Sequence, residues 1–489
     1  MIILLHPRTT RPKNRRFPLS VLSLAAVLEG REEYEIVDGN VDPQPGATLE
    51  RIMRERGGAL LLAVSVMPGP QLRAAIPLCR DFRARYPHVP IVWGGYFPSL
   101  YTAAALHARY VDFVVRGQGE DTLLELVEAL RTHRGFQEIR GLSYKDRFGF
   151  TVHNADRPIR SPNEFPLFPY HRLPEAEKYI VPTFLGKRTA VHQVSIGCPF
   201  RCNFCGVVPV YQGRARTEPP ERTAAVLEGL QRRFGIDAVQ FYDNNFFLAE
   251  SHAAELAERI VPMRLRWWCE GRIDTVLRYS DETLQLLRRA GATMIFFGAE
   301  SGSDRALEEM NKRITTAQTL ELAARIRRFG IIPEFSFVVG NPHSPETELR
   351  QTIRFIRRIK KINPESEIIV QHYIPTPSPD GMYGKVDNRI VFPSTPEEWA
   401  SDRWYNFTIR RDPQLPWLPT RVKRHIDNFE LVVSSRWPTV QDVQMPGWAR
   451  AMLKGLSSWR YAAGFYRWPL ELAAAQRLVA LRKPRLESL

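Results

Sequence analysis

The chain has 489 residues, of which 44% are hydrophobic and 25% are charged. This length predicts two or three domains, and this composition excludes a disordered chain. The formal net charge of +15 favours an anionic partner, such as nucleic acid, a lipid surface or a phosphate-bearing cofactor, or reflects an arginine-rich composition with no partner implied.

Secretion and membrane insertion are not expected. The longest apolar runs, such as residues 59–67, are roughly half as long as a helix that crosses a bilayer. The apolar start of the chain, residues 2–5, is too short for a secretory signal. Five cysteines, three of them clustered, do not resemble a secreted disulfide framework. We therefore expect a cytoplasmic protein.

The first region, residues 1–150, alternates short β-rich runs with amphipathic stretches. Strands are expected at 2–6, 34–37, 60–66, 91–94 and 113–116, with helices at 20–29, 49–56, 71–86 and 122–132. This rhythm predicts a doubly wound, Rossmann-like parallel sheet, which binds ligands at the carboxyl ends of its strands. The candidate binding residues at those ends are Asp38, Ser65, Gly94, Gly95, Gly117 and Glu120.

Three further regions follow. Residues 151–185 form a proline-rich linker that we expect to pack over a domain surface. Residues 186–385 alternate again, with strands expected at 190–196, 238–242, 265–270, 294–298, 335–339 and 368–373 and helices between them. Six βα units predict a partial (β/α)6 barrel. Residues 386–489 are predicted to be helical. The fold class is therefore α/β with a helical C-terminal region.

The segment Ser195–Gly206, SIGCPFRCNFCG, places Cys198, Cys202 and Cys205 within eight residues, directly after a predicted strand. Such a loop can bring three thiolates to one soft metal centre. A zinc site would need a fourth ligand, such as His192 or Cys269. A [4Fe-4S] cluster held by three cysteines would leave one iron open.

The C-x₃-C-x₂-C spacing, with Phe204 before the third cysteine, resembles the radical S-adenosylmethionine (SAM) superfamily. In that family the open iron binds SAM, whose reductive cleavage gives a 5′-deoxyadenosyl radical. Later strand ends also resemble the family: YDNNF at 242–246, CEGRID at 269–274, FGAESG at 297–302, VVGNP at 338–342 and IPTP at 374–377. The resemblance implies that SAM is bound by Asp243, Asn244, Arg272, Glu300 and Val339.

A doubly wound domain ahead of such a barrel resembles the cobalamin-binding radical SAM subclass. The resemblance, which covers about residues 1–385, implies cobalamin as a third cofactor beside SAM and the cluster. The Asp-x-His-x-x-Gly motif of methionine-synthase-type cobalamin domains is absent, since the loop after the first strand reads PRTTRPKNRR. His6, at the end of that strand, is expected to be a packing residue.

The resemblance implies a radical SAM enzyme, most simply a cobalamin-dependent methyltransferase acting on an unactivated carbon, or a phosphorus, of a small or lipid-like substrate. A cyclase or rearrangement enzyme without net methylation is the alternative, and RNA modification or zinc binding are alternatives of other classes. Nucleic acid is not an expected partner, because Cys79 and Cys269 lie far apart and do not form a second cysteine cluster.

Two partners are expected in addition to the substrate. A flavodoxin or ferredoxin would supply electrons. The tail, residues 449–489, mixes basic and aromatic residues with Leu and Ala, which fits a helix at a membrane surface or, equally, a helix docked on the barrel.

Overall fold

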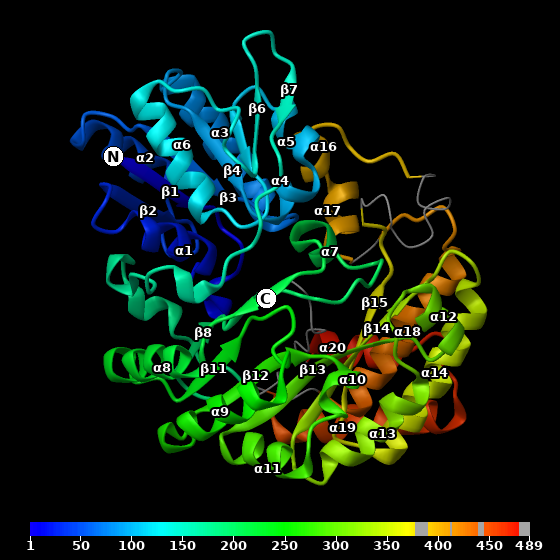
Figure 1. The fold of residues 1–489 in the computed structure, drawn as a ribbon. Helices are drawn as coiled ribbons and strands as arrows, with labels where there is room; N and C mark the ends of the chain where they lie inside the picture. Colours follow the sequence, from blue (N-terminus) through cyan, green and yellow to red (C-terminus); the bar gives the residue numbers. More distant parts are fainter. Residues whose placement is uncertain (377–389, 411–412, 439–444, 479–489) are drawn as a thin grey trace.

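The computed structural model describes residues 1–376, 390–410, 413–438 and 445–478. An N-terminal α/β domain lies above a curved parallel sheet, and the last helices of the chain pack along one side of that sheet (Figure 1). In the described ranges, none of the helices is long and apolar enough to cross a membrane.

The N-terminal sheet has the strand order β2-β1-β3-β4-β5-β6-β7 within the described residues. Its first five strands pair in parallel, and β6 and β7 add an antiparallel hairpin that the sequence analysis missed. The strand bounds are β1 Ile2–His6, β2 Tyr34–Asp38, β3 Leu61–Ser65, β4 Ile91–Gly94, β5 Phe113–Val115, β6 Leu142–Lys145 and β7 Thr151–His153. The hairpin extends this sheet just beyond residue 150, and the domain division there remains a proposal.

Helices cover both faces of this sheet, as expected for a doubly wound domain. The helices α1 Leu19–Leu28 and α6 Glu120–Thr132 share one apolar core with alternate residues of β1 and β3. The opposite core contains α2 Pro45–Glu55, α3 Pro70–Arg85 and α5 Thr102–His107. The short helix α4 Tyr96–Leu100 follows β4 directly.

The second sheet is a six-stranded parallel arc, in the order β15-β14-β13-β12-β11-β8, among the described residues. Its strands are β8 Thr189–His192, β11 Ala238–Phe241, β12 Arg266–Gly271, β13 Ala292–Glu300, β14 Ile332–Val339 and β15 Glu367–His372. The expected strand at 190–196 is two elements. The chain leaves the sheet after His192, and β9 Ser195–Gly197 forms an antiparallel ribbon with β10 Ala215–Thr217.

Helices on the outside of this arc complete a partial (β/α)6 barrel, which confirms the predicted fold class. They are α8 Pro220–Phe234, α9 Glu250–Ile260, α10 Ile273–Val276, α11 Asp281–Arg289, α12 Asp304–Glu309, α13 Thr316–Arg327 and α14 Pro345–Ile362. The short helix α7 Val207–Tyr211 lies instead at the rim, against β9 and against α4 of the N-terminal domain. The parallel pairing brings all the strands' carboxyl ends to one rim, which faces the N-terminal domain (Figure 1).

The C-terminal region is helical, as predicted, but it serves both domains. Its helices are α16 Pro396–Ala400, α17 Asp402–Thr408, α18 Thr420–Arg436, α19 Gly447–Ala463 and α20 Leu470–Leu478. Helix α18 packs on β15 and α14, whereas α16 contacts α3 and α5 of the N-terminal domain. Tyr110 of that domain donates a 2.9 Å hydrogen bond to Glu397. This segment therefore ties the two domains together.

Candidate functional site

The three clustered cysteines lie in the loop between β9 and α7, at the barrel rim. Cys202 is buried, Cys198 and Cys205 are partly buried, and all three are free thiols. Gly197 starts the loop with φ +77°, and a Cβ there would lie 2.2 Å from the carbonyl oxygen of Arg214. Only glycine permits this turn, which sends the chain from the ribbon into the cysteine loop.

Burial makes two of the three thiols, those of Cys198 and Cys205, weaker acids than a free cysteine. It raises the pKa of Cys198, and it raises the pKa of Cys205 to about 11. Cationic side chains stand beside them: the Arg272 guanidinium donates to Cys202 Sγ over 3.4 Å and stacks 3.7 Å from the Phe200 ring. Such cations favour the thiolate form that binding to iron requires.

The donor set fits an iron–sulfur cluster better than a single ion. In the described part of the chain, no group of three His, Cys, Asp or Glu side chains is placed to hold one metal ion. Neither His192, whose Nε2 is hydrogen-bonded to Glu218 over 2.7 Å, nor Cys269, which is buried in β12, belongs to such a group among the described residues. A [4Fe-4S] cluster does not need its ligands on one atom, because each cysteine binds a different iron.

Two predicted SAM residues follow β11, with different surroundings. Asp243 is buried and accepts hydrogen bonds from the backbone of Val194 and from the backbone and hydroxyl of Ser195. Burial raises its pKa to about 6. Its oxygens thus hold the segment leading into the cysteine loop, and its expected contact with SAM stays a prediction. Asn244 Oδ1, by contrast, is buried and has no partner among the described residues.

Asn245 was not singled out from the sequence. Its side chain is 1% exposed, and neither of its amide atoms has a hydrogen-bond partner among the described residues. Asn341, which follows β14 near the predicted Val339, has the same two unpartnered atoms. Because native proteins rarely leave buried amides unpaired, both positions fit contacts to a bound polar ligand. The Asn-Asn pair in YDNNF was the available signal for Asn245.

Glu300, at the end of β13, is buried and has φ +60°. A left-handed backbone at a non-glycine residue destabilises the fold by about 1–3 kcal/mol and is typical of functional sites. Its carboxylate pairs with Lys312 Nζ at 2.6 Å. Burial lowers the pKa of Lys312, but Glu300 and Cys202 together outweigh this effect, so the pKa of Lys312 lies above its ordinary value.

Lys312 and Arg410 were missed by the sequence analysis because only the fold brings them here. Lys312 Nζ lies 5.9 Å from the centre of the Phe204 ring, and its carbonyl accepts from Arg272 over 2.6 Å. Arg410, from the C-terminal region, donates to Gln371 over 2.5 Å. Burial lowers the pKa of Arg410, close to Glu300 and Cys205. The predicted exit motif 374–377 ends outside the described residues.

A cavity of about 440 Å³ lies between the N-terminal domain and the barrel. Five of the predicted cobalamin residues line it: Ser65, Gly94, Gly95, Gly117 and Glu120. Its apolar wall includes Leu24, Val64, Val92, Val115 and Leu123, and its polar groups include Ser20 and Ser99. Gly95 has φ +102°, and a Cβ there would lie 2.9 Å from Val66 O. An apolar crevice edged by hydroxyls and glycines fits a large ring cofactor with a polar tail.

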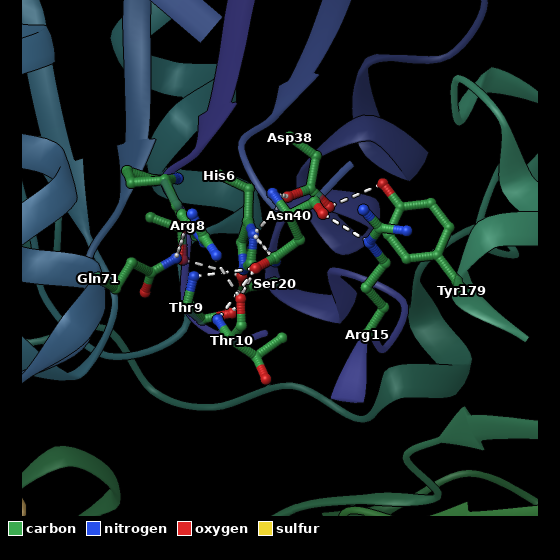
Figure 2. A network of polar contacts seen from close by, with 12 residues as sticks. His6, Arg8, Thr9, Thr10, Arg15, Ser20, Asp38, Asn40, Gln71 and Tyr179 are labelled. Atoms are coloured by element: carbon green, nitrogen blue, oxygen red, sulfur yellow. Dashed lines mark hydrogen bonds and ion pairs between the residues drawn. The ribbon is translucent and has the colours of Figure 1, made fainter. Parts of the chain in front are cut away.

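Asp38 is the exception, because it lies behind the cavity wall. Its carboxylate is fully buried and accepts hydrogen bonds from His6, Asn40 and Tyr179, as Figure 2 shows. Asp38 therefore contacts the cavity wall through its hydrogen bond with His6, which does line the cavity. Asp38 is not among the residues that line the cavity, and its expected contact with cobalamin stays a prediction. His6 was expected to be a packing residue, and its place in the cavity wall differs from that expectation.

The cavity and the cysteine loop adjoin. Asn244 Nδ2 donates to the Tyr96 hydroxyl over 3.3 Å, and both side chains line the cavity. Tyr211 in α7, just after the cysteine loop, lines it as well, with its ring 6.3 Å from that of Tyr96. A ligand in the cavity would thus be next to the residues assigned to SAM.

Comparisons with known proteins match this architecture. The radical SAM superfamily matches residues 193–356, and the B12 binding domain matches residues 7–127. An uncharacterized methyltransferase, PH0819, of Pyrococcus horikoshii is 28% identical over 348 residues, covering 70% of this chain and 73% of the relative. The anaerobic magnesium-protoporphyrin IX monomethyl ester cyclase of a Synechocystis species is 25% identical over 434 residues, covering 87% and 83%.

Among solved structures, the cobalamin-dependent SAM radical enzyme OxsB with aqua-cobalamin bound is similar, with a TM-score of 0.74 and 16% identity. The match covers 98% of this chain and 75% of that one, and shows a shared fold. With the cysteine loop at the barrel rim and the adjoining cavity, these matches show that the chain carries a radical SAM superfamily domain at residues 193–356, preceded by a B12 binding domain at residues 7–127.

Proposed function

We propose that the chain methylates an unactivated carbon, or a phosphorus, of a small or lipid-like substrate. The observation that carries this proposal is the contact between Asn244 and Tyr96, which joins the predicted SAM site to the cavity assigned to cobalamin. When bound, the cluster supplies an electron to SAM and the cobalamin supplies a methyl carrier. Their adjacency would allow a substrate radical and a methyl group to meet.

The chain's own residues would prepare this reaction. Asn244 and Asn245 offer free amide atoms to the polar groups of SAM, and Arg272 and Lys312 place positive charge beside the cysteine loop. The net reaction replaces a substrate hydrogen by methyl. It consumes two SAM and two electrons from a flavodoxin or ferredoxin, and gives S-adenosylhomocysteine, methionine and 5′-deoxyadenosine.

Product analysis with SAM trideuterated at its methyl group tests this proposal. The anaerobically reconstituted enzyme, supplied with cobalamin and a reductant, would be incubated with fractionated cell extract. A product that carries the trideuterated methyl group in place of hydrogen, formed together with S-adenosylhomocysteine, is expected. Turnover that gives 5′-deoxyadenosine without S-adenosylhomocysteine would instead favour a cyclase or rearrangement enzyme.

The C-terminal helices support contact with a lipid surface, which would suit a lipid-like substrate. Several large apolar side chains are exposed there: Trp448 (66%), Trp459 (52%), Phe465 (40%), Trp468 (70%) and Leu470 (74%). The same segment carries Arg450, Lys454, Arg467 and Arg477, and Glu471 is paired with Arg460 at 2.9 Å. Exposed tryptophans among cationic side chains are typical of helices at anionic bilayer surfaces.

Sedimentation with liposomes tests this contact. We expect the full chain to bind vesicles rich in phosphatidylserine, and Trp459→Ala with Trp468→Ala to lose most of that binding. Phe148→Ala with Phe150→Ala is the matched control, since these aromatics are as exposed (69% and 71%) but lie at the tip of the β6–β7 hairpin. Equal binding by the two variants would contradict the proposal.

A further inference from the structure

The outer surface of the cysteine loop carries exposed arginines from three segments of the chain. Together we call them the arginine patch: Arg201 in the loop itself, Arg214 and Arg216 directly before and within β10, and Arg313 in the loop between α12 and α13. Arg201 directly precedes Cys202. The patch therefore marks the side from which solvent reaches the predicted cluster site.

Polar contacts hold these segments together. Arg201 Nη2 donates to the carbonyl of Gln212 over 3.0 Å, and its guanidinium covers Gly213, where an added Cβ would lie 3.0 Å from Arg201 Nε. From the other segment, Asn311 Nδ2 donates to the Arg201 carbonyl over 2.7 Å, and Arg313 Nε donates to Asn311 Oδ1 over 3.3 Å. The arginines thus belong to one connected surface that the fold assembles around the cysteine loop.

The charge of the arginine patch is left without counter-charges in the described part of the chain. None of its guanidinium groups forms an ion pair with a residue that the structure describes. Two carboxylates on the linker beside it are engaged elsewhere, since Asp156 pairs with Arg116 at 3.0 Å and Glu164 pairs with Arg160 at 3.0 Å. Like charges that gather on one surface repel each other, and an anionic partner relieves this repulsion.

We propose that the arginine patch is the docking surface for an acidic electron-donor protein of the flavodoxin or ferredoxin type. This docking rests on the proposed function, in which Cys198, Cys202 and Cys205 hold the cluster. Electron-transfer partners meet through small, weakly binding surfaces, so opposite charges decide where they dock. A donor bound here faces the cysteine loop directly. It gives up one electron, and the cluster takes that electron up.

RNA is the other polyanion that a basic surface attracts, and the patch lacks the features that RNA recognition needs. Single-stranded nucleic acid is held by aromatic rings on which bases stack, next to the cations. The large exposed aromatic side chains of the described residues lie elsewhere, on the β6–β7 hairpin and the C-terminal helices. A folded acidic protein fits the patch better, because it needs only the charges.

Binding measurements with charge-reversed variants test the docking surface. Arg214→Glu with Arg216→Glu changes the patch and leaves the cysteine loop intact. Isothermal titration of the reconstituted protein with oxidised flavodoxin, and separately with oxidised ferredoxin, should give a Kd about tenfold weaker for this variant at low salt. Arg313→Glu, on another segment, should weaken binding in the same direction. The difference should vanish in about 1 M salt, where charges are screened beyond about 3 Å. The donor that binds the wild type more tightly is the one the patch fits.

Arg232→Glu with Arg289→Glu is the matched control. Both arginines are exposed and stand in the last turns of α8 and α11, which lead into the amino ends of β11 and β13, opposite to the cysteine loop. This variant has the same net charge as the Arg214→Glu, Arg216→Glu variant and should bind the donor as the wild type does. Equal weakening by both variants would overturn the docking surface. Loss of transfer RNA binding without loss of donor binding would overturn it too.

Formation of 5′-deoxyadenosine separates a failure of docking from a failure of the proposed function. Reduced methyl viologen is a small cation and needs no docking surface. The rate with reduced flavodoxin divided by the rate with reduced methyl viologen should fall about tenfold in the patch variant alone. A constant ratio in all the proteins would overturn the docking surface. A wild type that forms no 5′-deoxyadenosine with either reductant would overturn the proposed function instead.

Discussion

Lys312 Nζ and Glu300 Oε1 lie 2.6 Å apart, in an ion pair buried next to the cysteine loop. Both side chains are less than 10% exposed. Removing one member of such a pair leaves a charge without a partner in a poorly solvated place. The predicted SAM residue Glu300 therefore also contributes, through this pair, to the stability of the barrel rim.

Lys312→Met tests the energetic weight of this pair. It should lower the free energy of unfolding by about 3–5 kcal/mol, as expected when a buried pair loses one partner. Adding Glu300→Gln should recover part of the loss. Urea titration followed by circular dichroism measures both. Arg51→Met, which breaks the exposed Arg51–Glu55 pair, should change stability by less than about 1 kcal/mol.

Alanine substitutions in the cysteine loop test the cluster. We expect each of the substitutions Cys198→Ala, Cys202→Ala and Cys205→Ala to remove most of the iron and sulfide retained after anaerobic reconstitution. The loop provides only three cysteine ligands, so each variant would hold the cluster by two. Cys79→Ala is the control. Its thiol is buried against Trp93 at 3.3 Å, far from the loop in sequence, and the variant should keep its iron. Full iron retention in the loop variants would contradict the cluster assignment.

Gly95→Ala tests the backbone that edges the cavity. At φ +102°, with Val66 O 2.9 Å from the added Cβ, alanine should destabilise the chain by about 1–3 kcal/mol and weaken cobalamin retention. Gly229→Ala is the matched control, since it lies in α8 with open space around its Cα. It should raise stability by about 0.5–1 kcal/mol. Thermal melting and cobalamin absorbance after desalting report the two effects.

Glu348 predicts a pH dependence of stability. Burial raises its pKa to about 7, although Ser301 donates to it over 2.8 Å. Its folded pKa therefore lies above its unfolded value, so the unfolded chain ionises first as the pH rises. This group's contribution to stability is full below about pH 4.5 and falls until about pH 7.

Glu348→Gln removes this titration. Between pH 4.5 and 7, the stability of the wild type relative to the variant should fall by about 3 kcal/mol, at about 1.4 kcal/mol for each pKa unit. Guanidinium titrations at several pH values measure this difference. A constant difference across that range would show that Glu348 is ionised throughout.

The alternation of strands and helices was largely predictable, because each βα unit carries its own pattern. The expected strands at 2–6 and 91–94 coincide with β1 and β4. The hairpin β6–β7 was missed, since both strands are short and β7 is largely exposed. The cavity glycines were also predictable. They follow the carboxyl ends of predicted strands, and parallel pairing alone brings these ends to one rim.

Contacts between distant segments were not predictable from one sequence. Lys312 reaches Glu300 across a helix and a loop, and Asp38 meets His6 only through strand pairing. Helix α16 packs on α3 from the far end of the chain. No local periodicity encodes such pairs, so the sequence indicated Asp38 as a ligand residue without indicating that it acts through another side chain.

The cavity is walled by both domains, with Ser65 and Gly94 on one side and His192 and Tyr242 on the other. A molecule that fills it therefore binds the docked arrangement and neither domain alone. By mass action, its binding free energy adds directly to the association of the domains. A cofactor in the cavity would then stabilise the contact between the two domains. Its loss would be seen first as separate unfolding transitions of the N-terminal domain and the barrel.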